Sequence, residues 1–115
     1  MDYDLILHVD EDSQPVLNLA LTNAANYQNA LKAENFCLCL VANGPAVQLF
    51  TRDKADLMDR AKSLHQAGLR IKLCANALKT HKILEEDRWD FVEIVTAGLV
   101  EIVELQRRGF AYIKP

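Results

Sequence analysis

Cys74 is the residue of this sequence best placed for chemistry, because its thiol stands between an apolar run and a short helical segment. Residues 69–73 predict a strand that ends at Cys74, and residues 75–79 predict a short helix. Unpaired N–H groups and the positive end of the helix dipole favour a thiolate there. Such a thiolate is a candidate nucleophile or sulfur carrier. The alternative is a buried cysteine that only packs at the end of a strand.

Small polar residues and glycines follow the other predicted strands in the same way. In open parallel sheets, ligands bind beyond the carboxyl ends of the strands, where loops lead into helices. The sequence therefore predicts a ligand-binding edge near Cys74. Its candidate residues are His8, Asn43, Gly44, Asn76 and Gly98. Purely structural roles are the alternative: a hydrogen-bonded histidine at a strand end, and an Asn-Gly turn with positive φ.

The cysteines and histidines predict neither a disulfide framework nor a metal site. The chain has three cysteines, an odd number, and its three histidines stand at no recognised zinc spacing from them. Cys37 and Cys39 are two positions apart in a predicted strand, about 6.6 Å along one face, which is too far for a disulfide. We expect both in the core. Glycine-rich nucleotide-binding motifs are absent from the sequence, so no cofactor is expected.

Apolar runs alternate with helical patterns along the whole chain. The predicted strands cover residues 3–9, 36–42, 69–73, 92–95 and 110–113. Helices are predicted at 15–33, between Asp53 and Gly68, at 75–79 and at 98–107. This alternation predicts a single three-layer α/β/α domain over residues 1–115, with a mostly parallel five-stranded sheet of the flavodoxin-like topology class.

Composition and charge limit the partners that we expect. Half of the 115 residues are apolar and a quarter are charged, as in an ordinary globular domain. Lys and Arg number 13 against 16 Asp and Glu, a net charge of −3 that offers no basic field for nucleic acid. The longest apolar stretch is too short for a membrane span, and the opening residues are acidic, unlike a signal peptide. We therefore expect a cytoplasmic protein that binds neither membranes nor nucleic acid directly.

The predicted helix at 98–107 indicates self-association. Its apolar side chains surround it on most sides; they are Leu99, Val100, Ile102, Val103 and Leu105. One sheet face needs fewer apolar residues than this, so a subunit interface is predicted, although the sheet and a neighbouring helix together are the alternative. Trp89 lies in a polar stretch and is a candidate surface anchor for another subunit or a cover for the sheet edge.

The sequence resembles the DsrE/DsrF-like family, small α/β proteins linked to intracellular sulfur oxidation and sulfur relay. The resemblance covers nearly the whole chain: the opening strand with His8, Val-Ala-Asn-Gly at 41–44, Ile-Lys-Leu-Cys-Ala-Asn-Ala-Leu at 71–78, and the tail 97–115. It implies a five-stranded α/β/α fold and homo-oligomers, commonly trimers or hexamers. In the sulfur-relay members a cysteine after the third strand carries a persulfide, and Cys74 matches that position. The residues around Cys74 differ from those of the relay members and are typical of a less characterised branch.

These observations support three functions. The first is a sulfur carrier, or a sulfurtransferase-like enzyme, in which Cys74 accepts sulfane sulfur as a persulfide and passes it between a donor and an acceptor protein. The second is a non-catalytic, oligomeric binding module for a small ligand, with Cys74 lining the site. The third is a structural subunit of a hetero-oligomer.

Overall fold

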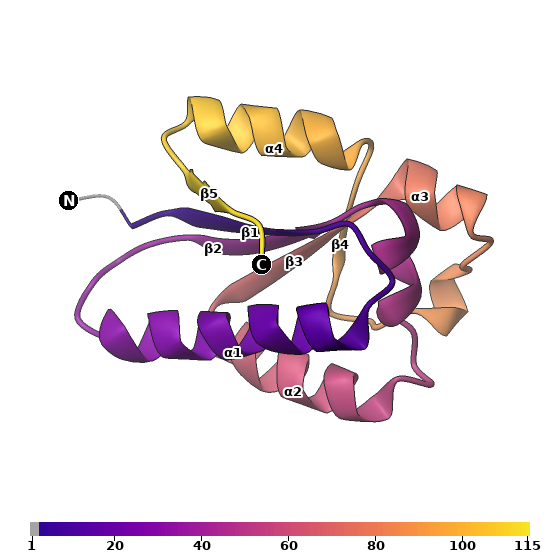
Figure 1. Cartoon of the computed structure of the whole chain (residues 1–115), viewed down its shortest axis with the longest axis horizontal. Coiled ribbons are helices and arrows are strands. Elements are labelled where there is room, and N and C mark those ends of the chain that lie inside the picture. Colours follow the sequence, from indigo (N-terminus) through magenta and orange to yellow (C-terminus); the bar gives the residue numbers. More distant parts are fainter. Residues whose placement is uncertain (1–2) are drawn as a thin grey trace.

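A sheet of five strands forms the middle layer of the structure (Figure 1). The computed structural model describes residues 3–115, so the first two positions of the predicted domain, Met1 and Asp2, lie outside the described residues. The strands stand in the order β4-β3-β2-β1-β5, and every neighbouring pair among them is parallel. Their bounds are β1 Leu5–Val9, β2 Leu38–Ala42, β3 Leu69–Cys74, β4 Glu93–Val95 and β5 Ala111–Ile113.

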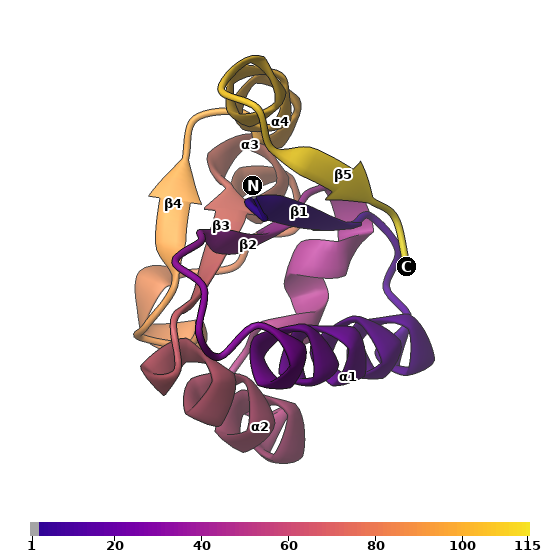
Figure 2. The ribbon, with the colours of Figure 1, turned by 90° about the vertical axis from the view of Figure 1, so that its left-hand side faces the viewer.

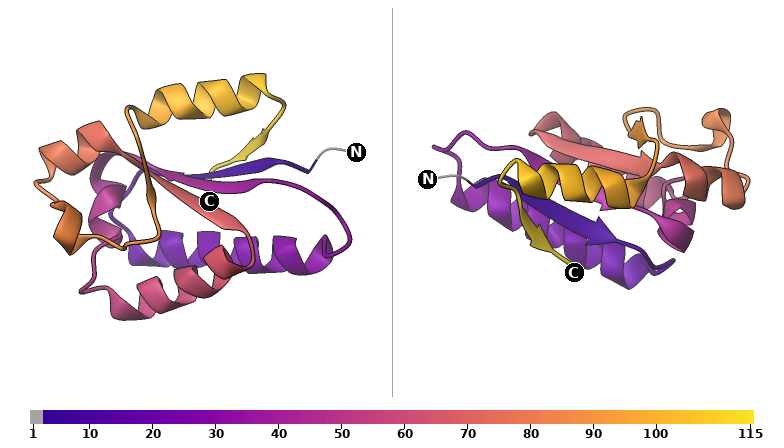
Figure 3. Two further views of the ribbon diagram at one scale, coloured as in Figure 1. Left: turned by 180° about the vertical axis from the view of Figure 1, so that it is seen from behind. Right: turned by 90° about the horizontal axis from the view of Figure 1, so that it is seen from above.

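Helices cover both faces of the sheet, which confirms the predicted α/β fold. Figure 2 shows α1 (Gln14–Ala30) and α2 (Ala55–Gln66) on one side and α4 (Gly98–Arg107) on the other. From β1 to β4 the chain moves across the sheet in one direction, and the crossover from β4 returns it to the far side of β1 (Figure 3). Right-handed crossovers in opposite directions place their helices on opposite faces, which explains the position of α4.

Three shorter helical segments complete the structure. The α-helix α3 (Ala75–Thr80) follows β3 directly, as predicted. The 3₁₀ helices are η1 (Gly44–Leu49), after β2, and η2 (Glu85–Asp87), before β4. Within residues 3–115, no helix has the length and apolar character needed to cross a lipid bilayer.

The helix α1 illustrates how local sequence sets the elements. The Ser13 hydroxyl accepts a hydrogen bond from the Val16 backbone N–H at 3.3 Å, and Pro15 occupies the first turn, where its missing N–H costs nothing. One stripe of this helix is buried against the sheet; it consists of Leu17, Ala20, Leu21 and Ala24. The helix ends at Ala30, three residues before the predicted end.

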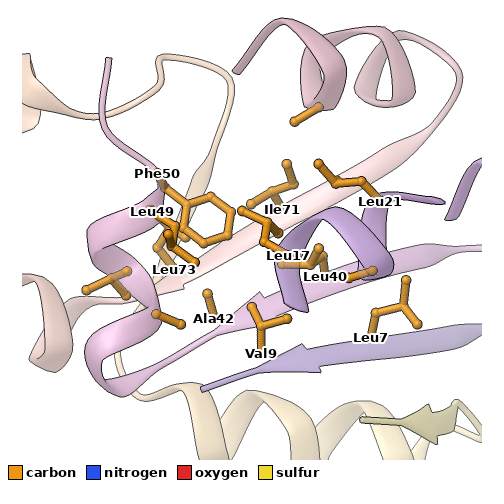
Figure 4. Packing of buried hydrophobic residues seen from close by; sticks show 14 of the residues in the cluster. Leu7, Val9, Leu17, Leu21, Leu40, Ala42, Leu49, Phe50, Ile71 and Leu73 are labelled. Atoms are coloured by element: carbon orange, nitrogen blue, oxygen red, sulfur yellow. The ribbon is translucent and has the colours of Figure 1, made fainter. Parts of the chain in front are cut away.

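The core is divided by the sheet into two clusters of unequal size. Figure 4 shows the larger one, where Leu7, Leu40 and Ile71 from adjacent strands meet Leu17 of α1. The smaller cluster lies under α4 and consists of Ile6, Cys39, Val41, Ile102, Leu105 and Phe110. Both β1 and β2 are buried along their full length, as expected for central parallel strands. The predicted site residues lie at or just beyond the carboxyl edge of this sheet.

Candidate functional site

Cys74 lies at the junction of β3 and α3, as the sequence predicted. It is the last residue of the strand and the N-cap of the helix, with extended backbone angles. Its side chain packs with the larger core cluster, and the residue keeps 7% of its surface exposed. Cys74 is therefore largely shielded, but it is not closed off from solvent.

Gly98 brings two of the predicted site residues together. A Cβ atom built on Gly98 would lie 3.1 Å from the Cβ of Asn43 and 3.5 Å from the Cβ of Cys74. Carbon atoms prefer separations of about 3.5–4.0 Å, so a side chain at this position would press on its neighbours. The missing side chain allows Asn43 and Cys74 to pack against the beginning of α4.

His8 joins the same group through a short hydrogen-bonded chain. Its Nε2 lies 2.7 Å from the Asn43 Oδ1, and its Nδ1 lies 2.6 Å from the Tyr112 hydroxyl. Only 7% of His8 is exposed, so both ring nitrogens have their partners inside the protein. The chain Tyr112–His8–Asn43 runs from the edge strand β5 across β1 to the end of β2. Tyr112 is not among the site residues predicted from the sequence.

Gly44 and Asn76 contribute less to this group. Gly44 has a φ of +57°, which confirms the expected turn with positive φ, and the turn keeps the Asn43 backbone N–H bonded to the Val9 carbonyl at 3.2 Å. Asn76 is exposed, and its carbonyl accepts a hydrogen bond from Thr80 within α3. Within residues 3–115 no hydrogen bond joins the Asn76 side chain to His8 or Asn43. The structure therefore groups His8, Asn43, Gly98 and Cys74, with Asn76 beside them on the surface.

The other two cysteines occupy different environments. Burial raises the pKa of the Cys39 thiol, and the nearby Lys72 opposes this only in part. The expectation that Cys37 is also buried is wrong, because β2 begins one residue later and Cys37 is exposed. Its backbone N–H donates to Asp4 Oδ1 at 2.7 Å. All three cysteines are free thiols.

A largely buried ion pair joins β3 to α4 near the candidate site. The ammonium group of Lys72, two residues before Cys74 on β3, donates to Glu101 on the first turns of α4. The side chains are 7% and 19% exposed. A second pair at the more open part of this face joins Arg70 to Glu93 through two hydrogen bonds of 2.9 and 2.7 Å, and it lowers the pKa of Glu93.

A small hollow of about 240 Å³ opens beside the first turns of α4. It is lined by Val95, Thr96, Ala97, Val100, Glu101 and Glu104. Val95 is the register partner of Cys74 on the neighbouring strand, but Cys74 itself is not among the residues that line the hollow. A hollow of about 380 Å³ at the amino-terminal edge of the sheet, around Gln28 and Gly68, contains none of the predicted site residues. Among residues 3–115, no group of three or more His, Cys, Asp or Glu side chains is arranged to hold a metal ion.

The fold and the site together define a small parallel α/β protein with a shielded thiol at the carboxyl edge of its sheet. The model of the DsrE/DsrF-like family matches residues 4–115, essentially the whole chain. The chain therefore belongs to the DsrE/DsrF-like family, and the resemblance inferred from its motifs is confirmed.

Solved structures agree with this assignment. MTH1491 from Methanobacterium thermoautotrophicum, described as a protein of unknown function, is 30% identical with a TM-score of 0.90, over 99% of this chain and 100% of that chain. The ychN protein from E. coli is 20% identical with a TM-score of 0.81, over the full length of both chains. BT1422 from Bacteroides thetaiotaomicron is 16% identical with a TM-score of 0.77, over 97% and 94% of the two chains. The last two show the shared fold alone. No curated protein matches the chain.

Proposed function

We propose that this protein is a cytoplasmic sulfur carrier that holds sulfane sulfur as a persulfide on Cys74. The observation that supports this best is the grouping of one thiol with a polar network at the carboxyl edge of the sheet. Cys74 packs around Gly98 together with Asn43, whose carboxamide is fixed by His8. The other thiols are less suited, because Cys39 is buried with a raised pKa and Cys37 lies apart from this edge, before β2.

The proposed transfer needs no external oxidant. The Cys74 thiolate attacks the terminal sulfur of a donor persulfide, R–S–SH. A bond forms between the Cys74 Sγ and that sulfur while the R–S bond breaks, so that the donor leaves as the thiolate R–S⁻ and Cys74 becomes Cys–S–SH. An acceptor thiolate then attacks the outer sulfur in the same way, which regenerates the Cys74 thiolate. In each step the hydrogen stays on the transferred sulfur.

The neighbours of Cys74 have defined roles in this proposal. Gly98 lets Asn43 and Cys74 pack close to the beginning of α4, and the Asn43 carboxamide donates a hydrogen bond to the added sulfur atom. His8 holds Asn43, and Gly44 provides the turn that places Asn43 at the strand end. The exposed Asn76 lies where a donor or acceptor protein must approach. The low exposure of Cys74 protects a bound persulfide from bulk solvent.

The proposal includes assembly into a homo-oligomer, a trimer or a hexamer, through the outer face of α4. Leu99, Val100 and Val103 are 63%, 57% and 44% exposed, whereas Ile102 and Leu105 pack on the sheet. Burying such side chains in a second copy removes apolar surface from water. We expect sedimentation to show an oligomer for the native protein and a folded monomer for Leu99→Asp. A native protein that sediments as a monomer at micromolar concentration contradicts this assembly.

A binding module without transfer chemistry is the second candidate function. It is favoured by the 7% exposure of Cys74 and by the hollow of about 240 Å³ at the first turns of α4, which has room for a small ligand. In this case Cys74 only lines the site. A Cys74→Ser variant that retains the binding of a small ligand would support it over the carrier.

Incubation with a sulfane-sulfur donor and a cysteine desulfurase, followed by peptide mass analysis, tests the carrier directly. We expect one added sulfur atom on the peptide that contains Cys74 and none at that peptide in Cys74→Ala. Cys37→Ala is the matched control, because it removes an exposed thiol away from the site. An unmodified Cys74 peptide in a protein whose Cys74 reacts with an alkylating probe would instead favour the binding module.

A further inference from the structure

The outer end of the hydrogen-bonded chain, Tyr112, has no role in the function proposed above. It lies on the edge strand β5, in register with Ile6 of β1, and its hydroxyl reaches the Nδ1 of His8 at 2.6 Å. The two rings are tilted by 55° with their centres 5.6 Å apart. Figure 2 shows β5 lying beside β1 at this side of the sheet. The contact joins residues that are 104 positions apart in the sequence.

The two contacts of His8 determine where its ring hydrogen lies. Asn43 presents a carboxamide oxygen, which only accepts hydrogen bonds, so the His8 Nε2 must carry the hydrogen. In the neutral ring Nδ1 is then an acceptor, and the Tyr112 hydroxyl donates to it. A second histidine provides the opposite arrangement, because the Nδ1 of His65 faces the Leu69 carbonyl at 2.9 Å and must carry the hydrogen itself.

The orientation of Asn43 follows from the orientation of His8. With its oxygen held by Nε2, the Asn43 carboxamide turns its Nδ2 group away from His8. Among residues 3–115, no hydrogen bond to a protein group occupies this Nδ2. The Cβ atoms of Asn43 and Cys74 are packed around the same glycine, so the two side chains begin close together.

We propose that Tyr112 is a positioning residue for sulfur transfer, and that it acts on Cys74 through His8 and Asn43. This inference rests on the proposed carrier function. The Tyr112 hydroxyl fixes the hydrogen on Nε2 of His8, His8 fixes the carboxamide of Asn43, and Asn43 directs its N–H groups at the persulfide. An anionic sulfur accepts such hydrogen bonds, and a donor already oriented toward it loses little entropy when the sulfur arrives.

The test compares Tyr112→Phe and Asn43→Asp with the native protein in two measurements. The first is the rate of persulfide formation at the Cys74 peptide. We expect Tyr112→Phe to slow it about threefold to tenfold, the effect of one hydrogen bond. Asn43→Asp keeps an oxygen for His8 but replaces the N–H donors by a second anionic oxygen, so we expect a larger loss. Tyr27→Phe is the matched control, since it removes a hydroxyl bonded at 2.7 Å to Tyr3 on the opposite face of the sheet.

The second measurement is a proton–nitrogen correlation spectrum of the histidine rings in alkaline buffer. We expect the hydrogen on Nε2 for His8 and on Nδ1 for His65 in the native protein, and a mixed state for His8 alone in Tyr112→Phe. Native-like sulfur loading in folded Tyr112→Phe, or a hydrogen on Nδ1 of His8, overturns the inference. If native Cys74 takes up no sulfur, the proposed function has failed. The alkylation rate of Cys74 then replaces sulfur loading in the same comparison, and an unchanged rate in Tyr112→Phe overturns the positioning role.

Discussion

Replacing Gly98 by alanine tests how tightly the site is packed. The added Cβ would lie 3.1 Å from the Asn43 Cβ, 3.5 Å from the Cys74 Cβ and 3.7 Å from the Val41 Cγ1. The first contact is shorter than the optimum of about 3.5–4.0 Å, so one of the neighbours must move. Val41 is fully buried in the smaller cluster, whereas Asn43 is held by hydrogen bonds and partly exposed. We therefore expect Asn43 to shift and its bond to His8 to weaken.

Two opposing effects set the size of the stability change. Gly98 does not have positive φ, so alanine gains about 0.4–1 kcal/mol by restricting the unfolded chain. Inserting a methyl group into a packed site costs about 1–3 kcal/mol. The free energy of unfolding should therefore fall by about 1 kcal/mol, which lowers the urea midpoint by roughly 0.5–1 M for an m value of about 1–2 kcal/mol/M.

The assay combines urea unfolding with mass-resolved alkylation of Cys74. We expect Gly98→Ala to lose stability and to change the alkylation rate of Cys74 by several-fold. Gly68→Ala is the control, because Gly68 has a φ of +116° and no atom within 4 Å of the added Cβ. It should lose about 1 kcal/mol through backbone strain alone and leave the Cys74 rate unchanged. A Gly98→Ala protein that is as stable as the native one, with the native Cys74 rate, would refute this account of the packing.

Three further predictions follow from the charges and thiols around the site. Glu101→Gln removes the charge that pairs with the buried Lys72, so it should lower the free energy of unfolding by about 3 kcal/mol in urea titrations. This value is at the lower end for a buried ion pair, because Glu101 keeps 19% exposure. A loss below about 1 kcal/mol would show that the pair behaves as a surface ion pair. Arg70 lowers the pKa of Glu93, so this ion pair stabilises the protein at pH values above the ordinary glutamate pKa of about 4.3. The stabilisation is lost as the pH falls through the lowered pKa of Glu93. Glu93→Gln should therefore flatten the acid end of the stability curve, and an unchanged slope there would contradict the assignment. In a labelling time course the exposed Cys37 should react first and Cys39, whose pKa burial raises, last; early labelling of Cys39 would be inconsistent with its burial.

Most of the fold follows from the sequence because the local patterns agree with the tertiary structure. The strands β1 to β5 all lie within the predicted segments, apart from the final Cys74 of β3, and α4 has the predicted bounds at 98–107. The predicted and observed starts of two strands differ. The first strand begins at Leu5 rather than residue 3, and β2 begins at Leu38, which exposes Cys37. Strand ends depend on where the neighbouring strand stops, and a single apolar run contains no information on that.

The role of Trp89 shows what a local pattern cannot predict. Its polar neighbours in the sequence indicated either a surface anchor or a cover for the sheet edge, and Trp89 is 1% exposed. Its ring packs on Phe50 with centres 4.9 Å apart, and its Nε1–H donates to the Thr51 carbonyl at 2.9 Å. The interpretation as a surface anchor is therefore wrong. The segment after η1 that receives Trp89 is nearly forty residues away, and no periodicity connects the two.

The position of the candidate site was predictable from the sequence, but the contacts between its side chains were not. The rule for parallel sheets identified Cys74, Asn43, His8 and Gly98 as residues of one edge, and the structure places them together. The rule does not specify which side chains bond to each other. Tyr112 reaches the site because β5 pairs with β1, which places Tyr112 opposite Ile6. This pairing follows from the crossover between β4 and β5, which depends on the fold of the whole chain.

The sulfur content of Cys74 is the most direct test of the central claim. A chain with Cys37 and Cys39 both replaced by serine retains Cys74 as its only thiol, so that its intact mass reports on that residue alone. After treatment with a cysteine desulfurase and cysteine, we predict a mass increase of one sulfur atom, which an acceptor thiol then removes. An unchanged mass in the folded protein, with Cys74 still open to alkylation, would contradict the carrier function.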